Sequence, residues 1–144
     1  MKTDVQQLIP ALRFPEFEGE WESSTLEKVC KDVSYGMNSA AIKFDGTNKY
    51  IRITDIDEAS RQFKPNPITS PNGTIEDKYI LKKGDIVFAR TGASVGKSYL
   101  YSEDDGKLLF AGFLIKFSIF SANPYFIFLQ TFNNGSVKLY EHIY

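Results

Sequence analysis

Two cations, Arg90 and Lys97, flank a short loop of small residues near the middle of the chain. The loop reads Thr-Gly-Ala-Ser-Val-Gly over residues 91–96, and it follows the apolar residues 86–89, a run typical of a short β-strand. Strand-like chemistry resumes at residues 99–101. The pattern predicts that one strand delivers a flexible loop with a cation on each side, and that a second strand leaves it.

This loop resembles, at first sight, the glycine-rich loop that binds the phosphates of nucleotides. That motif has four residues between its first glycine and the following Gly-Lys-Ser, and a helix begins directly after it. Here three residues separate Gly92 from Gly96, and Thr91 occupies the position of the first glycine. Because the residues after Ser98 are strand-like, they offer no helix N-terminus to an anion. The spacing argues against a nucleotide-binding enzyme.

A metal-dependent nuclease is the other enzyme class to consider, because residues 76–78 form an acid-x-Lys triplet, Glu-Asp-Lys. Such sites need the triplet on a strand, with a further carboxylate that helps to hold Mg²⁺. Here it precedes the strand-like residues 79–81, and its acids are typical of a turn or a helix start. A single cysteine, Cys30, and a single histidine, His142, provide no Cys-based zinc site. We expect no catalytic residue, no metal and no cofactor.

Residues 83–97, Lys-Gly-Asp-Ile-Val-Phe-Ala-Arg-Thr-Gly-Ala-Ser-Val-Gly-Lys, resemble a recurrent segment of one family. The family is the specificity subunit of type I restriction-modification systems, and the segment belongs to its target recognition domain. Three other segments agree in the same order: Leu12-Arg-Phe-Pro-Glu-Phe17 with Trp21, Tyr50-Ile-Arg-Ile-Thr-Asp-Ile56, and Leu109-Phe-Ala-Gly-Phe-Leu-Ile115. The resemblance covers about residues 11–130, and four ordered segments are more specific than one glycine motif.

Specificity subunits do no chemistry. They read one half of a bipartite double-stranded DNA target on behalf of methyltransferase (modification) subunits and restriction-translocase subunits. The resemblance therefore implies a DNA-binding, non-enzymatic protein of a host-defence system. A full specificity subunit resembles two target recognition domains separated by long helices. This chain has one such domain and no long helix, which indicates a fragment or a truncated product.

Arg90 is the strongest candidate for a base contact, because its planar fork of donors matches guanine in the major groove. The alternative is that Arg90 pairs with Asp85 or another carboxylate. Lys97 and Arg52 are candidates for phosphate contacts, since Lys97 has one flexible ammonium and Arg52 lies on the open side of a predicted strand. Two hydroxyls that can assist complete this group: Thr91 and Ser98.

A long segment, residues 57–77, shows little periodicity and contains three prolines. Loops of this length within a compact domain are uncommon and are often functional or disordered. Three of its residues are further candidates for DNA contacts: Arg61, Lys64 and Asn72. The alternative interpretation, a solvated excursion without function, fits the sequence equally well.

The rest of the pattern predicts an α+β domain over residues 21–144, preceded by an extended arm over residues 1–20. We expect one twisted mixed β-sheet, with short helices packed on it and long DNA-reading loops. The strands expected in this sheet are residues 50–56, 85–90, 97–101 and 113–120. The expected helices are residues 26–33, with apolar residues at helical spacing and Tyr35-Gly36 at its end, and residues 125–132, where Asn123-Pro124 is a typical helix start.

Composition limits the function only loosely. The chain has 144 residues, a net charge of −1 and an aromatic content of 15%, which fits a β-rich core. An isolated DNA-binding protein is usually basic, so near-neutrality favours a reader that works inside an assembly, or else a protein–protein adaptor. Neither a signal peptide nor an apolar run of membrane-spanning length is evident, which predicts a cytoplasmic protein without a membrane partner.

Overall fold

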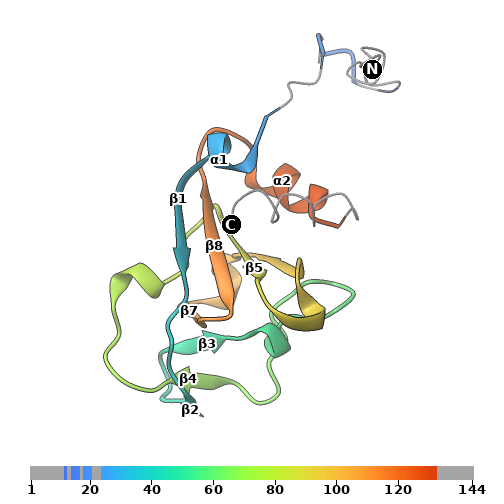
Figure 1. Ribbon diagram of the computed structural model, residues 1–144. Helices are drawn as coiled ribbons and strands as arrows, with labels where there is room; N and C mark the ends of the chain where they lie inside the picture. Colours follow the sequence, from blue (N-terminus) through green and yellow to red (C-terminus); the bar gives the residue numbers. More distant parts are fainter. Residues whose placement is uncertain (1–11, 13, 17, 21–23, 133–144) are drawn as a thin grey trace.

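A computed structural model describes residues 12, 14–16, 18–20 and 24–132 of the chain (Figure 1). The expected N-terminal arm therefore lies mostly outside the described residues, as does the end of the predicted domain after residue 132. The described part is built on a four-stranded antiparallel sheet with the strand order β1-β8-β5-β6. Its strands are β1 (Cys30–Tyr35), β5 (Asp85–Ala89), β6 (Ser98–Leu100) and β8 (Leu114–Ile119).

The two central strands, β5 and β8, are buried along their whole length. One face of the pair contributes Val87 and Leu114 to one apolar cluster, and the other face contributes Ile86 and Phe117 to a second. Because both faces are covered, β5 is a continuous apolar run rather than an alternating one. The strand predicted over residues 85–90 is confirmed.

Two smaller strand pairs lie beside the main sheet. β2 (Ala41–Lys43) pairs antiparallel with β4 (Thr69–Pro71), and β3 (Lys49–Ile51) pairs parallel with β7 (Leu108–Phe110). Four single-turn 3₁₀ helices connect the strands: η2 (Ile53–Asp55), η3 (Asp77–Tyr79), η4 (Gly92–Ser94) and η5 (Glu103–Asp105). The α+β class is confirmed. The prediction of one mixed sheet is wrong, because the four-stranded sheet is antiparallel and the parallel pairing belongs to a separate strand pair.

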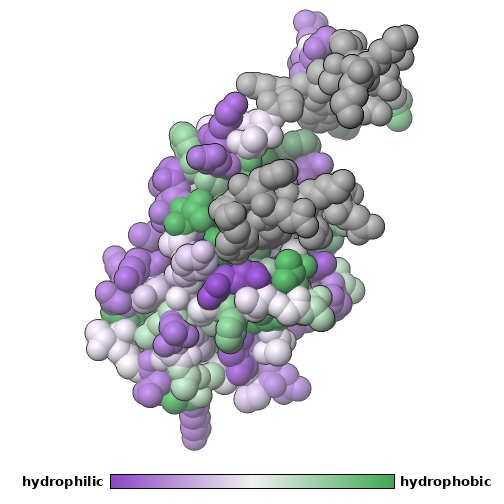
Figure 2. Space-filling model, viewed as in Figure 1, coloured by the Kyte–Doolittle hydropathy of each residue, from purple (hydrophilic) through white to green (hydrophobic). Residues whose placement is uncertain are grey.

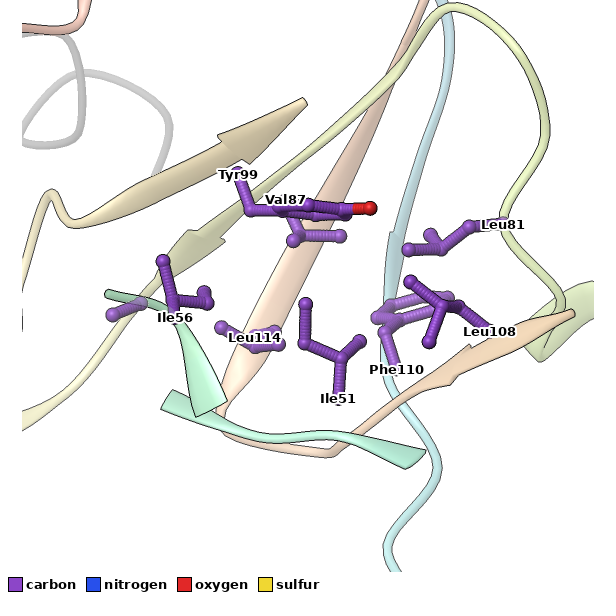
Figure 3. Packing of buried hydrophobic residues seen from close by; sticks show 9 residues of the cluster. Ile51, Ile56, Leu81, Val87, Tyr99, Leu108, Phe110 and Leu114 are labelled. Carbon is purple, nitrogen blue, oxygen red and sulfur yellow. The ribbon is translucent and has the colours of Figure 1, made fainter. Parts of the chain in front are cut away.

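The strand predicted over residues 50–56 ends at Ile51, where the chain enters η2. The Asp55 carboxylate causes this turn, since it accepts a hydrogen bond from the Arg52 backbone N–H at 2.9 Å. Ile51 itself is fully buried and joins the same apolar cluster as Val87. Figure 3 shows side chains from β3, β5, β6, β7 and β8 converging in this cluster, which fastens the small strand pair to the main sheet.

The helix predicted over residues 26–33 is wrong beyond its first turn. α1 covers only Leu26–Val29, and the chain continues as the edge strand β1. In this strand Val33 lies opposite Phe117, and Tyr35 lies opposite Ile115 of β8. Valine and tyrosine favour strands, so pairing with β8 overrides the local helical spacing.

The C-terminal helix, α2 (Pro124–Gln130), begins where the sequence predicts. The Asn123 side-chain oxygen accepts hydrogen bonds from the backbone N–H groups of Tyr125 and Phe126, at 2.9 and 3.3 Å. Four apolar residues lie at helical spacing here: Tyr125, Phe128, Leu129 and Phe132. Only Phe128 of these is buried, and the other three are between 43% and 60% exposed. Both helices lie at one end of the sheet, and β2, β3 and β4 lie at the other (Figure 1).

Gly36 was expected to end a helix, but it marks a close approach between two backbones. It lies directly after β1, and a Cβ atom at this position would overlap the carbonyl groups of Phe110 and Ala111. We expect Gly36→Ala to lower the free energy of unfolding by about 1–3 kcal/mol, since backbone rather than a flexible side chain must move. Urea unfolding checks this. Gly73→Ala is unsuitable as a control because Gly73 has a positive φ. Ala40→Gly is the control instead, since Ala40 is exposed and this change adds no atom that could overlap with the backbone.

Candidate nucleic-acid interface

The small-residue loop, residues 90–97, connects β5 to β6 and is closed at its base by backbone hydrogen bonds. The Ala89 N–H donates to the Lys97 carbonyl oxygen at 2.8 Å, and the Gly96 N–H donates to the Ala89 carbonyl oxygen at 3.0 Å. Gly92 and Gly96 have φ angles of 71° and 90°, a conformation that glycine adopts without strain. The turn itself therefore requires both glycines, and it leaves Thr91 exposed.

Arg90 is held in one orientation at the start of this loop. Its Nε donates a hydrogen bond to the Gly112 carbonyl oxygen at 3.0 Å, and its guanidinium carbon lies 4.8 Å from the centre of the Tyr35 ring. Stacking on an aromatic face fixes the plane of a guanidinium and adds a cation–π attraction. Two contacts from two different strand ends thus determine where the fork of Arg90 points.

The two terminal nitrogens of Arg90 remain available. Neither has a hydrogen-bond partner within the described part of the chain, and neither is fully buried. The expected alternative, an ion pair with Asp85, is not formed: that carboxylate accepts hydrogen bonds from the Lys82 backbone N–H and the Ser118 hydroxyl, at 2.8 and 2.7 Å. Arg90 therefore presents an oriented pair of N–H donors to the surface.

Two exposed aromatic residues flank Arg90. Tyr35 is 52% exposed and Phe113 is 62% exposed, and the Arg90 backbone N–H donates to the Phe113 carbonyl oxygen at 3.0 Å. We call these three residues the aromatic–arginine patch. Because β1 ends, β5 ends and β8 begins here, the patch lies at the end of the sheet away from α1 and α2.

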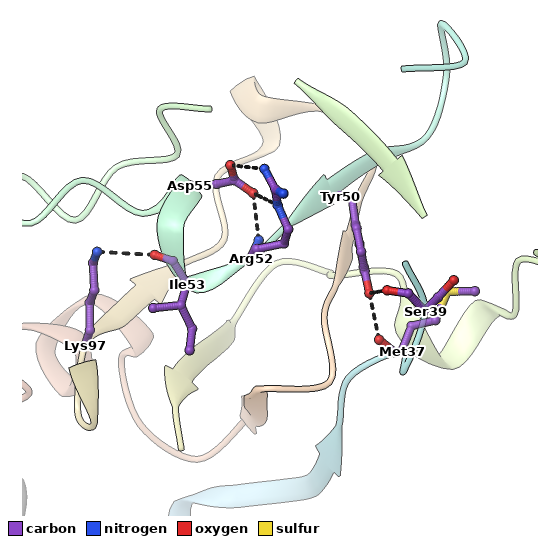
Figure 4. Close-up of polar contacts among 7 residues, drawn as sticks. All are labelled: Met37, Ser39, Tyr50, Arg52, Ile53, Asp55 and Lys97. Atoms are coloured by element: carbon purple, nitrogen blue, oxygen red, sulfur yellow. Dashed lines mark hydrogen bonds and ion pairs between the residues drawn. The ribbon is translucent and has the colours of Figure 1, made fainter. Parts of the chain in front are cut away.

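Lys97 and Ser98, at the other side of the loop, point inward. Lys97 is 8% exposed, and its Nζ donates to the Ile53 carbonyl oxygen at 3.2 Å (Figure 4). The same Nζ lies 3.2 Å from a carboxylate oxygen of Glu58. The Ser98 hydroxyl is buried and shares a 2.6 Å hydrogen bond with the Thr131 hydroxyl. Lys97 therefore ties the small-residue loop to η2, and Ser98 ties β6 to the end of α2.

Arg52 is also engaged within the protein. Its Nε and one terminal nitrogen donate to the two oxygens of the Asp55 carboxylate, at 2.9 and 3.1 Å (Figure 4). The hydrogen bond from the Asp55 side chain raises the pKa of Arg52, and burial opposes that shift. Arg52 thus holds η2 in shape, and its remaining terminal nitrogen has no hydrogen-bond partner among the residues that the structure describes.

The three candidates from the segment 57–77 differ in exposure. Lys64 and Asn72 have exposed side chains, and their backbone N–H groups donate to Asp55 and Ala40. Arg61 has a φ of 57°, unusual for a residue other than glycine, and its guanidinium carbon lies 5.4 Å from the Phe132 ring centre. Lys64 and Asn72 are therefore the exposed members of these three, whereas Arg61 is half-buried.

The comparisons gave no family. A scan against models of known protein families found no match for this chain, and neither did a search of curated proteins. Over the ranges that the structure describes, no group of three His, Cys, Asp or Glu residues is placed to hold a metal ion. No helix in those ranges is long and apolar enough to cross a membrane.

Sequence reasoning found Arg90 but missed Tyr35 and Phe113. Tyr35 was interpreted as the end of a helix, and Phe113 as one more residue of a strand. These residues come together only through the pairing of β1 and β5 with β8. The paired residues lie far apart in the chain, so no local pattern indicates that they meet.

Proposed function

We propose that this chain is a DNA-recognition module of a type I restriction-modification specificity subunit. It reads one half of a bipartite target for methyltransferase and restriction-translocase partners in the cytoplasm, and it does no chemistry itself. The observation that carries the proposal is the oriented, unpaired donor pair of Arg90 within the aromatic–arginine patch. The four sequence segments that resemble the family support the same function.

The geometry of Arg90 suits a bidentate contact to a base. With Nε bound to the Gly112 carbonyl oxygen, only the two terminal nitrogens can reach a ligand, and they do so side by side. Two parallel donors match the O6 and N7 acceptors of guanine in the major groove. The stack on Tyr35 fixes the plane of these two donors, as a bidentate contact to a base requires.

Phosphate contacts come from exposed polar side chains on the described surface. Thr91, Lys64 and Asn72 are the exposed members of the predicted set. Arg52, Arg61, Lys97 and Ser98 act mainly as supports for the loops, since each contacts another part of the protein. With a net charge of −1, affinity for phosphates without partner subunits is expected to be weak.

A protein–protein adaptor is the second candidate, and one observation favours it. Large apolar side chains are exposed on and beside α2: Phe120, Tyr125, Leu129 and Phe132, between 43% and 61%. Figure 2 shows hydrophobic and hydrophilic residues interspersed over the visible face, without a broad region of either kind. Such residues also suit a DNA reader that docks on partner subunits, so the two functions are separated by testing whether binding depends on DNA sequence.

We expect Arg90→Ala to cost about 1–3 kcal/mol of binding free energy at one base pair and to relax the preference there, because the donor pair is lost. The full chain is first used to select duplexes from a random pool at low salt. Wild type and Arg90→Ala are then titrated against the selected duplex and its single mismatches. Lys64→Ala is the matched control: it should weaken all duplexes about equally and reduce the salt slope by about one unit.

Two results would contradict this assignment. If Arg90→Ala weakens every duplex equally and keeps each mismatch penalty, Arg90 contacts the backbone rather than a base. If the wild-type chain selects no sequence and its binding to other proteins is insensitive to salt, the adaptor is the better description.

A further inference from the structure

Arg90 and Phe113 are cross-strand neighbours. The antiparallel register of β5 and β8 runs from Asp85 opposite Ser118 to Ala89 opposite Leu114. Arg90 and Phe113 lie one residue beyond this last pair, and the Arg90 backbone N–H donates to the Phe113 carbonyl oxygen at 3.0 Å. Side chains directly opposite each other leave the same face of a sheet, with Cβ atoms about 5 Å apart. By this register, the side chains of Arg90 and Phe113 leave the same face of the sheet.

Phe113 is held firmly despite its exposure. It follows Gly112 in the tight turn between β7 and β8, where the Leu114 N–H donates to the Ala111 carbonyl oxygen at 3.0 Å. A single exposed phenylalanine is ordinary on a protein surface. This one differs because the carbonyl oxygen of the preceding residue, Gly112, orients Arg90, and the Phe113 carbonyl oxygen accepts the Arg90 backbone N–H.

We infer that Phe113 contacts the C5-methyl group of a thymine next to the guanine bound by Arg90; this inference rests on the proposed function. Among the standard base edges in the major groove, only thymine presents a methyl group, and phenylalanine is one of the side chains that contact it. Successive bases are separated by about 3.4 Å along a strand, which side chains rooted about 5 Å apart can span. The recognised element is thus a G·C pair beside a T·A pair.

Deoxyuridine tests this inference directly, because it differs from thymidine only by the missing methyl group. In the duplex selected with the wild-type chain, each thymidine beside the guanine is replaced by deoxyuridine. We expect wild type to bind the substituted duplex about fourfold more weakly, the loss that corresponds to one buried methyl group. Phe113→Ala should bind both duplexes equally, and Phe113→Leu, which keeps an apolar side chain, should retain part of the preference.

Wild type and Phe113→Ala are each measured with the thymidine and the deoxyuridine duplex, and the four binding constants form a double-mutant cycle. This cycle isolates the contribution of the contact between the Phe113 ring and the methyl group. Since Phe113 is 62% exposed, the urea midpoint of Phe113→Ala should match that of wild type. Equal midpoints exclude loss of folding as the cause of weaker binding. Any of three results overturns the inference while DNA recognition stands. The selected duplex has no thymine beside the guanine, or deoxyuridine does not weaken binding of the wild-type chain. The third result is that deoxyuridine weakens binding of Phe113→Ala as much as that of wild type. Failure of the wild-type chain to select any duplex overturns the proposed function as well.

Discussion

Replacing Phe128 with alanine is expected to lower the free energy of unfolding by about 3–5 kcal/mol. Phe128 is the buried residue of α2 and is only 9% exposed. It belongs to the apolar cluster that includes Ile86 and Phe117 of the central strands, and its ring meets that of Phe132 edge-on, with centroids 5.1 Å apart. Truncation removes this packing and leaves a cavity, because strands β5 and β8 cannot move to fill it.

Urea unfolding measures this effect, and a matched control lies on the same helix. Tyr125→Ala removes an aromatic side chain of similar size that is 60% exposed, so its free energy of unfolding should stay within about 0.5 kcal/mol of the wild-type value. Equal midpoints for wild type and Phe128→Ala would show that α2 does not anchor the sheet. Equal losses in the two variants would mean that Tyr125 is also covered.

The elements that the sequence predicts well are those determined by nearby residues. β5 is a continuous apolar run bounded by Gly84-Asp85, and α2 begins at an asparagine cap followed by proline. Both signals act within a few residues of the chain, so no knowledge of the rest of the fold is needed.

The helix predicted over residues 26–33 fails for the opposite reason. Its apolar spacing fits a helix, but the chain forms β1 by pairing with β8, where Cys30 lies opposite Ile119. A partner so distant in sequence leaves no trace in a local pattern, and the competition between helix and strand is decided by tertiary contacts. The same limit concealed the aromatic–arginine patch, because Tyr35 and Phe113 meet Arg90 only after β1, β5 and β8 have paired.

The candidate site was predictable in its residue types but not in their directions. Arg90 and Lys97 look equivalent in sequence, one on each side of the loop. In the structure, Arg90 stacks on exposed Tyr35, whereas Lys97 reaches the backbone of Ile53 beneath the loop. Which side of a sheet each cation faces depends on strand register, and a shift of one residue would exchange them.

We expect Lys97→Ala to lower the free energy of unfolding by about 3–5 kcal/mol. The Ile53 carbonyl oxygen loses one of its two donors and keeps the Ile56 backbone N–H at 3.3 Å. A hydrogen bond from a charged group contributes about 1.5–3 kcal/mol, and the buried side-chain methylenes of Lys97 lose about 0.8 kcal/mol each. The ion pair with Glu58 adds little, because that carboxylate is 81% exposed and strongly screened. Lys97→Met keeps an apolar chain of similar length, so it should lose only the hydrogen-bond contribution, and Glu58→Gln should change stability by less than about 1 kcal/mol.

The same variants separate a support from a phosphate contact. If Lys97 holds the small-residue loop against η2, Lys97→Met should lower the urea midpoint and leave the salt dependence of DNA binding unchanged. If Lys97 instead turns outward to a phosphate, the salt slope should fall by about one unit, as expected for Lys64→Ala, with little change in stability. Urea midpoints and salt titrations of both lysine variants decide between these roles. An unchanged urea midpoint for Lys97→Met would show that the contact with Ile53 does not hold the loop.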